Sequence, residues 1–361
     1  MKAAVCYEFG KPLVIEELDI DAPRKGEVKI RNAATAVCHS DIHALRGELP
    51  TRLPMVAGHE SAGYVEEVGE GVTRVKPGDH VIVSLVASCG HCYFCARGLG
   101  HICETRFTLD KESPLRNKQG QRIANMVKVA GFAEHIIATE SQCAIVPNEL
   151  PMDRACLLAC GVITGFGSVV NRAKVRPNES VVVIGTGGVG LNAIQGAVYS
   201  GAYPIIAVDL LDNKLEAARS FGATHTINSA QEKEPAKAVQ ALTSGRGADY
   251  AFVTVGNTAA VQQAFYMCGP RGMTVIVGLA PPADKLALPP RDFVRSEKTI
   301  MGAFMGSTVL SVDIPRYVSL YQRGQLKLDE LITARYPLEK INEAIEAVEK
   351  GQALRNVIVF K

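Results

Sequence analysis

The segment that decides the fold runs from residue 180 to residue 190, where SVVVI (Ser180–Ile184) leads directly into GTGGVG (Gly185–Gly190). A continuous run of β-branched residues is typical of a parallel strand buried on both faces. The six residues after it satisfy G-x-G-x-x-G, a pattern that alone also fits an ordinary tight turn in a chain with 33 glycines. Because the next residues, Leu191–Ser200, are expected to form a helix, the context favours a dinucleotide-binding turn.

The same alternation of buried strand and helix continues downstream. Strands are predicted at Pro204–Val208, Tyr250–Val255 and Thr274–Val277, with helices at Asn213–Phe221 and Thr258–Cys268. Repeated strand–helix units of this kind predict a doubly wound parallel sheet.

The residue that ends the second predicted strand indicates which dinucleotide binds. Asp209 lies 19 residues after Gly190, where a carboxylate accepts hydrogen bonds from the adenosine ribose and repels a 2′-phosphate. Leu210 and Leu211 supply no neighbouring arginine, so the sequence favours NAD over NADP. The glycines let the backbone approach the pyrophosphate at the start of the helix. The predicted contacts in this turn are Gly185, Gly187, Gly188, Val189 and Gly190.

The regions on either side of this α/β block have a different character. The first 150 or so residues are expected to be mainly β, with short apolar runs at Glu27–Ile30, Gly63–Val68 and His80–Leu85. Beyond about Ser296 we expect two helices and a closing strand, around Ile314–Arg323, Leu338–Lys350 and Asn356–Phe360.

The composition is that of a globular chain of more than one domain. Of 361 residues, 47% are hydrophobic and 21% charged, and the formal net charge is only +2. These values argue against a disordered chain or a nucleic-acid-binding protein. The N-terminal residues have no apolar core of a secretory signal, and no stretch approaches the length of a membrane span. We therefore expect a cytoplasmic protein, in which most thiols stay reduced.

Four of the ten cysteines form a local cluster, Cys89-x2-Cys92-x2-Cys95-x7-Cys103. Four thiolates at such spacing can surround one tetrahedral zinc, and a closed set of four leaves no position for substrate. The cluster therefore predicts a structural zinc. An iron–sulfur cluster and two disulfides are the competing interpretations.

Three further ligand-type residues are dispersed along the chain: Cys38, His59 and Cys160. Each alone is compatible with ordinary packing, and their separation in sequence gives no evidence that they meet. Together, two cysteines and one histidine would form an open zinc site with a fourth position for a substrate oxygen.

Several motifs in a fixed order resemble one family. Gly58-His59-Glu60-x2-Gly63-x5-Gly69 is similar to the signature of the zinc-containing alcohol dehydrogenases of the medium-chain dehydrogenase/reductase family. The four-cysteine segment, LLACG at 157–161, the GTGGVG turn and ALRN at 353–356 resemble the same family. The resemblance implies a Rossmann doubly wound parallel sheet plus a mainly β GroES-like catalytic domain. It places the catalytic domain at residues 1–161 and 304–361, with a structural zinc lobe at about 89–103, and the dinucleotide domain at 162–303.

The resemblance also implies a role for individual residues. Cys38, His59 and Cys160 would bind the catalytic zinc, with Glu60 beside them and Asp41 orienting the histidine. Ser40 and His43 would relay the alcohol proton to solvent. The further positions implied in cofactor binding are His39, Thr164, Lys214 and Arg355.

The implied reaction is the reversible, NAD-dependent oxidation of an alcohol to an aldehyde or ketone, by hydride transfer from a zinc-bound alkoxide. The alternative is a thiol-adduct formaldehyde dehydrogenase, because the chain looks closest to the class III, glutathione-dependent branch. That branch has tyrosine where this chain has His43, and of its glutathione contacts only Glu48 has a counterpart here. A zinc-free reductase and a non-catalytic binding protein are less compatible with the two metal sets.

The expected partners are a small-molecule alcohol or aldehyde, two zinc ions per chain and NAD, with no nucleic acid and no membrane. A homodimer or homotetramer is implied by the family, through a strand at Thr299–Phe304. The remaining cysteines are expected to pack as small apolar residues: Cys6, Cys143, Cys156 and Cys268.

Overall fold

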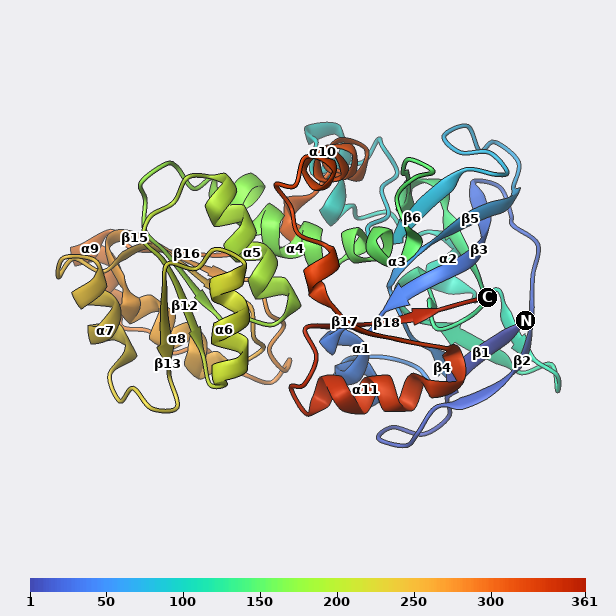
Figure 1. Cartoon of the computed structure of the whole chain (residues 1–361). Coiled ribbons are helices and arrows are strands. Elements are labelled where there is room, and N and C mark those ends of the chain that lie inside the picture. Colours follow the sequence, from blue (N-terminus) through green and yellow to red (C-terminus); the bar gives the residue numbers. More distant parts are fainter. The chain divides into compact units, whose positions relative to one another are not determined.

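The computed structural model describes residues 1–361, which form two compact units (Figure 1). The first unit comprises Met1–Gly161 and Val309–Lys361, and the second comprises Val162–Thr308. The break expected between residues 303 and 304 therefore lies inside the second unit. Residues beyond 303 stay with that unit because they pack on it: the Asn171 side-chain amide donates to the carbonyl of Gly306 at 3.4 Å.

The first unit is mainly β, as predicted, and contains a barrel and a sheet. The closed barrel is formed in the order β1 (Lys2–Cys6), β2 (Val14–Ile20), β7 (Leu115–Asn117), β8 (Arg122–Asn125) and β4 (Met55–Val56). The seven-stranded sheet follows the order β10 (Cys143–Ile145), β6 (His80–Ser84), β5 (Glu60–Val68), β3 (Glu27–Ala36), β18 (Arg355–Val359) and β17 (Ile332–Tyr336), while β9 (His135–Thr139) also pairs with β3.

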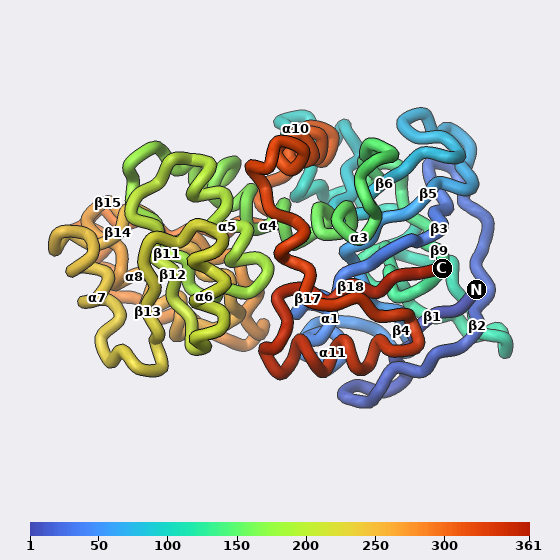
Figure 2. The backbone as a smooth tube through the Cα atoms, viewed as in Figure 1, coloured from blue at the N-terminus to red at the C-terminus, as the bar shows by residue number.

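The sheet forms because β-branched residues alternate along its long strands. Val28 and Ile30 of β3 and Val65 of β5 are almost fully buried in one apolar cluster. The alternation places these side chains on one face of the sheet, where their burial stabilises it. The C-terminal strand completes the sheet, since β18 pairs antiparallel with β3, as the chain trace in Figure 2 also shows.

Short helices and turns connect the strands of the first unit. The α-helices are α1 (His39–Leu45), α2 (Thr108–Lys111), α3 (Met152–Ala155), α10 (Leu310–Gln322) and α11 (Ile341–Glu349). The 3-10 turns are η1 (Cys95–Arg97), η2 (Gly100–Ile102), η3 (Met126–Lys128), η4 (Glu140–Gln142), η5 (Cys156–Ala159), η8 (Asp329–Leu331) and η9 (Leu338–Lys340).

The second unit contains a six-stranded parallel sheet. Its order is β13 (His225–Asn228), β12 (Ile205–Asp209), β11 (Val181–Ile184), β14 (Ala248–Val253), β15 (Cys268–Ile276) and β16 (Thr299–Gly302). Because the order runs outward in both directions from β11, the sheet is doubly wound, and ligands bind such sheets at the strand ends where the order reverses. The GTGGVG turn follows β11, so it lies at that point.

Helices precede the first strand of this sheet and connect the later ones. They are α4 (Gly161–Gly167), α5 (Gly188–Tyr199), α6 (Asp212–Ser220), α7 (Pro235–Leu242), α8 (Thr258–Met267) and α9 (Pro290–Ser296), with a π-helical turn η6 (Ser168–Ala173) and a 3-10 turn η7 (Met305–Ser307). The predicted core elements are present with small shifts; α5, for example, begins at Gly188 rather than Leu191. No single helix is long and apolar enough to cross a membrane, and one bent pair, Met152–Ala159 with Gly161–Ala173, passes on length and composition alone.

Candidate functional site

The three dispersed ligand-type residues come together in the first unit. Cys38 immediately precedes α1, His59 immediately precedes β5, and Cys160 follows η5. Their ligand atoms all lie within 4.8 Å of one another, and all three residues are buried. Two sulfurs and one imidazole nitrogen at this spacing can hold one metal ion and leave a fourth position open.

Asp41, in the first turn of α1, fixes the geometry of this ligand set. Its Oδ1 accepts from His59 Nδ1 at 2.8 Å and from the backbone N–H of Gly58 at 3.0 Å. Its Oδ2 accepts from the backbone N–H of Cys38 at 3.0 Å. A single buried carboxylate therefore positions two of the three ligand residues, and it leaves His59 Nε2 as the nitrogen that faces a metal.

Gly58 is required by the same arrangement. Its φ is +92°, and a Cβ there would meet the backbone nitrogen of Phe132 at 2.6 Å. Only glycine permits the close approach that points the Gly58 N–H at Asp41 and turns His59 inward.

The electrostatics of the set favour a bound cation. The Cys160 thiol, with a further contribution from His59, lowers the pKa of Cys38 well below its ordinary value. The same hydrogen bond and burial raise the pKa of Cys160. Burial opposes protonation of His59, but the Asp41 carboxylate outweighs it and raises the pKa of His59. A divalent ion would compete with protons for Cys160 and His59, the two ligands whose pKa is raised.

Glu60 and Arg355 border the ligand set. Glu60 is fully buried and accepts from the backbone N–H of Gly161 at 2.9 Å. Burial raises the pKa of Glu60 to about 7, although the Arg355 guanidinium opposes the shift. The closest approach of Arg355 to Glu60 is 3.6 Å, and both Glu60 Oε2 and Arg355 Nη2 are buried without a hydrogen-bond partner. The Arg355 guanidinium thus balances the buried charge of Glu60 without a direct hydrogen bond to it.

The four clustered cysteines form a separate set in the loop that carries η1 and η2. The sulfurs of Cys89, Cys92, Cys95 and Cys103 lie within 4.8 Å of one another. Two of the sulfur–sulfur distances are 3.9 Å (Cys89–Cys95) and 3.8 Å (Cys92–Cys103). A zinc tetrahedron with Zn–S of about 2.3 Å has edges of about 3.8 Å, so the set fits one ion. A disulfide needs about 2.05 Å, and all ten cysteines are free.

Protonation in this set depends on a cation. The Thr105 hydroxyl, together with backbone N–H groups, lowers the pKa of Cys89 to about 5. Burial raises the pKa of Cys95 to about 12. Without a metal ion Cys95 would therefore keep its proton near neutral pH, and metal binding would release it.

The dinucleotide turn of the second unit has the open backbone that a pyrophosphate needs. A Cβ at Gly190 would meet the Gly185 carbonyl oxygen at 1.9 Å, so that glycine is needed for packing. A Cβ at Gly187 would meet nothing within 4 Å, so the space beside the start of α5 is open. Asp209 lies at the end of β12, where its carboxylate accepts from the backbone N–H of Thr186 at 2.7 Å and from that of Leu210 at 2.8 Å.

The remaining predicted positions lie on elements of both units. Ser40 and His43 are half-buried on α1, and His43 Nδ1 pairs with the Glu48 carboxylate. Thr164 lies in α4, and its hydroxyl donates to the sulfur of Met305 at 3.7 Å. The other two positions are His39, exposed at the start of α1, and Lys214, buried in α6.

Comparisons with known proteins show the family of this chain. Residues 24–148 match the alcohol dehydrogenase GroES-like domain, and residues 188–323 match the zinc-binding dehydrogenase family. The NDMA-dependent alcohol dehydrogenase of Amycolatopsis methanolica is 42% identical over 367 residues, covering 99% of this chain and 98% of that protein. This chain belongs to the zinc-containing alcohol dehydrogenases of the medium-chain family.

Further alcohol dehydrogenases support the assignment. The class-3 alcohol dehydrogenase of Dictyostelium discoideum is 37% identical over 369 residues, covering 99% of this chain and 97% of that one. The benzyl alcohol dehydrogenase of Acinetobacter calcoaceticus has a TM-score of 0.93 at 32% identity, over 100% of this chain and 99% of that one. A zinc-binding-domain alcohol dehydrogenase from Burkholderia ambifaria has a TM-score of 0.95 at 35% identity, over 100% and 98%. The protein is therefore an enzyme of the zinc alcohol dehydrogenase family with a GroES-like and a Rossmann domain.

Sequence reasoning missed two contacts in this alcohol dehydrogenase. The Gly161 N–H that holds Glu60 lies next to Cys160 in the quoted LLACG segment, yet no pattern indicates a bond across 101 positions. Thr186, within the glycine turn, also donates its hydroxyl to Asp209 at 3.0 Å. The variable position of a G-x-G motif offers a signal for this second contact, because its side chain faces the strand that carries the acidic residue.

Proposed function

We propose that this enzyme reversibly oxidises an alcohol to an aldehyde or ketone, with NAD as the hydride acceptor and zinc at Cys38, His59 and Cys160. The observation that carries the proposal is the assembly of these three residues around one position, with the histidine fixed by Asp41. Two cysteines and one histidine are the protein ligands known for the catalytic zinc of alcohol dehydrogenases. Zinc at this position supplies a Lewis acid that makes an alcohol hydroxyl acidic near neutral pH.

The chain's own residues then hold the metal and handle the proton. Asp41 keeps the His59 ring in one tautomer and one orientation, which fixes where a substrate oxygen can sit. Ser40 is proposed to accept the alcohol proton. His43, with Glu48 beside it, is proposed to pass that proton to solvent. The buried ligand set excludes water from all but the open position, which favours hydride transfer over side reactions.

Cofactor binding is proposed for the second unit. The open space at Gly187 and the start of α5 suit the pyrophosphate. The backbone N–H and the hydroxyl of Thr186 both donate to Oδ2 of Asp209, and these bonds orient the carboxylate. A fixed carboxylate at this place favours ribose hydroxyls and opposes a 2′-phosphate, so NAD is the proposed dinucleotide. When bound, NAD would supply the hydride acceptor, and the hydroxyl proton would leave through Ser40 and His43.

The cofactor assignment is tested with Asp209→Gly. We expect the ratio of kcat/KM for NAD to that for NADP to fall by about tenfold or more, because the repulsion of a 2′-phosphate is removed. Steady-state rates with each dinucleotide measure the ratio. Gly187→Ala, which fills the open space without changing charge, is the matched control; it should weaken both cofactors alike. An unchanged ratio in Asp209→Gly would mean that the ribose contact is misplaced.

Two relatives suggest that the reaction could use another hydride acceptor or require a thiol, and one substrate panel distinguishes these cases. One relative is named as NDMA-dependent and another as a class-3 enzyme. Alcohol oxidation is therefore compared with NAD or NDMA as acceptor, and formaldehyde oxidation with and without added thiol. Activity on simple alcohols with NAD alone supports the proposal, whereas activity only with a thiol supports the alternative, a thiol-adduct formaldehyde dehydrogenase.

A further inference from the structure

Cys160 is the one ligand of the dispersed set that Asp41 does not position. The Asp41 carboxylate accepts from the backbone N–H of Cys38 and from the ring of His59. These bonds fix two of the three ligands relative to each other. The position of the third ligand must come from other contacts.

Cys160 also lies at a break between two helical segments. The turn η5 ends at Ala159, and α4 begins at Gly161. The backbone of Cys160 has φ of −143° and ψ of −69°, whereas a helix has values of about −63° and −42°. A continuous run of helical hydrogen bonds therefore does not hold this residue in place.

Buried side chains hold the peptide groups on both sides of Cys160. The Ser84 hydroxyl donates to the carbonyl oxygen of Ala159 at 2.7 Å. On the other side, the N–H of Gly161 donates to Oε1 of Glu60 at 2.9 Å. Ser84, Ala159 and Glu60 are fully buried, and hydrogen bonds away from water are stronger than exposed ones.

Two fixed peptide groups determine the direction of the side chain between them. The Ala159 carbonyl belongs to the planar peptide group before the Cα of Cys160, and the Gly161 N–H belongs to the one after it. Holding both planes sets φ and ψ of Cys160, and hence the direction of its Cα–Cβ bond. Only the rotation about that bond remains, and it has three staggered positions. The location of the sulfur thus depends on Ser84 and Glu60.

Ser84 and Glu60 act from one place in the sheet. They are directly opposite each other in the antiparallel pair of β6 and β5. Side chains at opposed positions lie on the same face of a sheet, with Cβ atoms roughly 4.5–5.5 Å apart. Because His59 immediately precedes Glu60, this cross-strand pair ties Cys160 to the strand that presents the histidine ligand.

The Ser84 hydroxyl has a defined orientation. A carbonyl oxygen only accepts, so the serine supplies the proton in its bond to Ala159. Its oxygen in turn accepts from the backbone N–H of Val86 at 3.4 Å. The Gln142 side chain, which is also fully buried, donates to the Ser84 carbonyl at 2.9 Å. Ser84 is therefore itself held in place.

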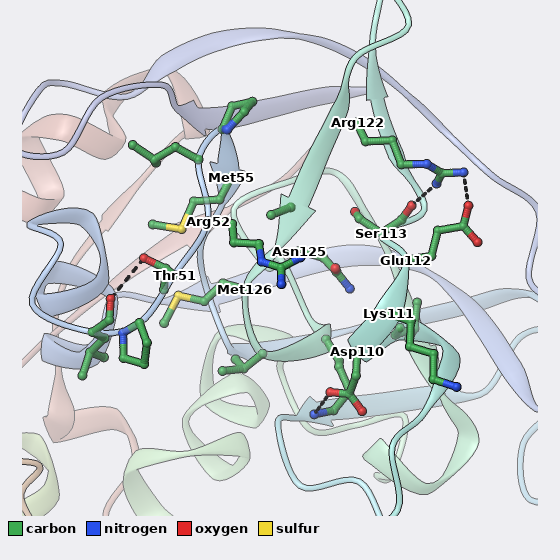
Figure 3. Close-up of a pocket in the computed structure, with 18 residues that line it drawn as sticks. Thr51, Arg52, Met55, Asp110, Lys111, Glu112, Ser113, Arg122, Asn125 and Met126 are labelled. Carbon is green, nitrogen blue, oxygen red and sulfur yellow. Dashed lines mark hydrogen bonds and ion pairs between the residues drawn. The ribbon is translucent and has the colours of Figure 1, made fainter. Parts of the chain in front are cut away.

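This contact is separate from a cavity of about 650 Å³ in the same unit (Figure 3). The cavity is lined by Leu49–Met55, Leu109–Ser113 and Arg122–Lys128. Neither Ser84 nor any residue of η5 belongs to this lining. Removing the Ser84 hydroxyl therefore leaves the residues that form the cavity unchanged.

We propose that Ser84 is a positioning residue of the metal site, whose hydroxyl, together with Glu60, sets where the Cys160 sulfur lies. The inference rests on the proposed function, since it concerns the metal site of the same reaction. Ser84 touches neither the ligand atoms nor a substrate, and it acts only through the backbone beside Cys160.

The proposal is tested by titrating the metal-free enzyme with Co²⁺, whose visible absorption depends on the geometry and the thiolate ligands of its site. The difference between wild type and Cys38→Ser gives the absorption band of the dispersed set, apart from that of the four cysteines. In Ser84→Ala this band should shift, and the Co²⁺ affinity should fall by about tenfold, at the lower end of the effect of removing a group that orients a ligand.

Ser61→Ala is the matched control. Ser61 is a fully buried serine on β5, and its hydroxyl donates to Thr35 Oγ1 at 3.0 Å rather than to the segment of Cys160. Both variants lose one buried hydrogen bond, so both should lower the Tm, but only Ser84→Ala should change the band. Ser84→Thr, which keeps the hydroxyl, should restore the wild-type affinity. Equal band and affinity in Ser84→Ala and Ser61→Ala overturn the proposal.

The titration requires neither NAD nor an alcohol, which separates this inference from the proposed function. If the two serine variants differ as expected but no alcohol is oxidised, the inference stands and the proposed function fails. If alcohols are oxidised with NAD and the two variants bind Co²⁺ alike, only the inference fails.

Discussion

The two cysteine-containing sets of this enzyme both offer sulfur ligands, but they differ in where the ligands lie in the sequence and in how many there are. The four-cysteine set lies within fifteen residues of one partly exposed loop and supplies all four positions of a tetrahedron. The other set draws Cys38, His59 and Cys160 from three distant parts of the chain, buries them and supplies only three positions. The first is local and closed, and the second is assembled by the fold and open.

The difference separates the two roles of a metal ion. No residue of η1 or η2 is buried, so the four-cysteine loop has almost no hydrophobic core. A zinc ion bound by the local, closed set would hold this loop together instead. The dispersed set forms only when β3, β5 and η5 are in place. Its geometry therefore results from folding and does not drive folding. Loss of a ligand should therefore affect stability in one set and activity in the other.

Cys95→Ser gives the largest expected effect. Structural zinc contributes roughly 10–16 kcal/mol in small zinc-binding peptides, so losing it should destabilise the protein by several kcal/mol. Metal analysis and thermal unfolding should show one zinc lost per chain and a clearly lower Tm. Cys143→Ser, at a buried cysteine outside both sets, should keep both zincs. Full thermal stability in Cys95→Ser would contradict a structural role.

Cys38→Ser should act mainly on catalysis. Loss of the Lewis acid should lower kcat/KM for alcohols by about a thousandfold or more, with one zinc lost per chain. The Tm should fall less than in Cys95→Ser, because the sheet around the site is already formed. Cys156→Ser is the matched control, since this buried cysteine lies in η5 but outside the ligand cluster. Zinc content that survives Cys38→Ser unchanged would contradict the assignment.

Asp41→Asn should affect only one of the two metal sets, since only the set of Cys38, His59 and Cys160 has a carboxylate that positions its histidine. We expect zinc affinity at this site to fall by about 10–100-fold, the usual effect of removing such a partner. Competition with a chelator measures the affinity, and the zinc of the four-cysteine set should be retained. If both zincs were lost together, the two sets would not be independent.

His43→Gln should have the smallest effect, about tenfold in kcat/KM, because the variant keeps both metal sets intact. The loss should be greatest at low pH, since hydroxide at high pH can accept the proton directly. A pH–rate profile measures it, with zinc content as the control. An equal loss at every pH would count against a proton relay.

The comparison also explains how much of the molecule was predictable from its sequence. The four-cysteine set and the GTGGVG turn are local, so their spacing and flanking strand indicated their chemistry, and the doubly wound sheet was confirmed. Cys38, His59 and Cys160 could be joined only through the resemblance to a family, because no local rule brings residues 122 positions apart together. The second unit runs to Thr308, past the boundary expected near residue 303, and contacts such as that of Asn171 with Gly306 are not visible in a pattern.

The pairing of β18 with β3 has a consequence for synthesis of the chain. The second unit, Val162–Thr308, leaves the ribosome complete, while the first unit still lacks the strand that carries Arg355. Domains generally fold as they emerge from the ribosome, so the second unit can fold before the first unit is complete. Until β18 arrives, residues 34–36 of β3 lack their partner strand on that side, and the charge beside Glu60 is missing. The metal centre thus receives Arg355 only after the whole second unit has been made, which delays its completion beyond that of the dinucleotide-binding fold.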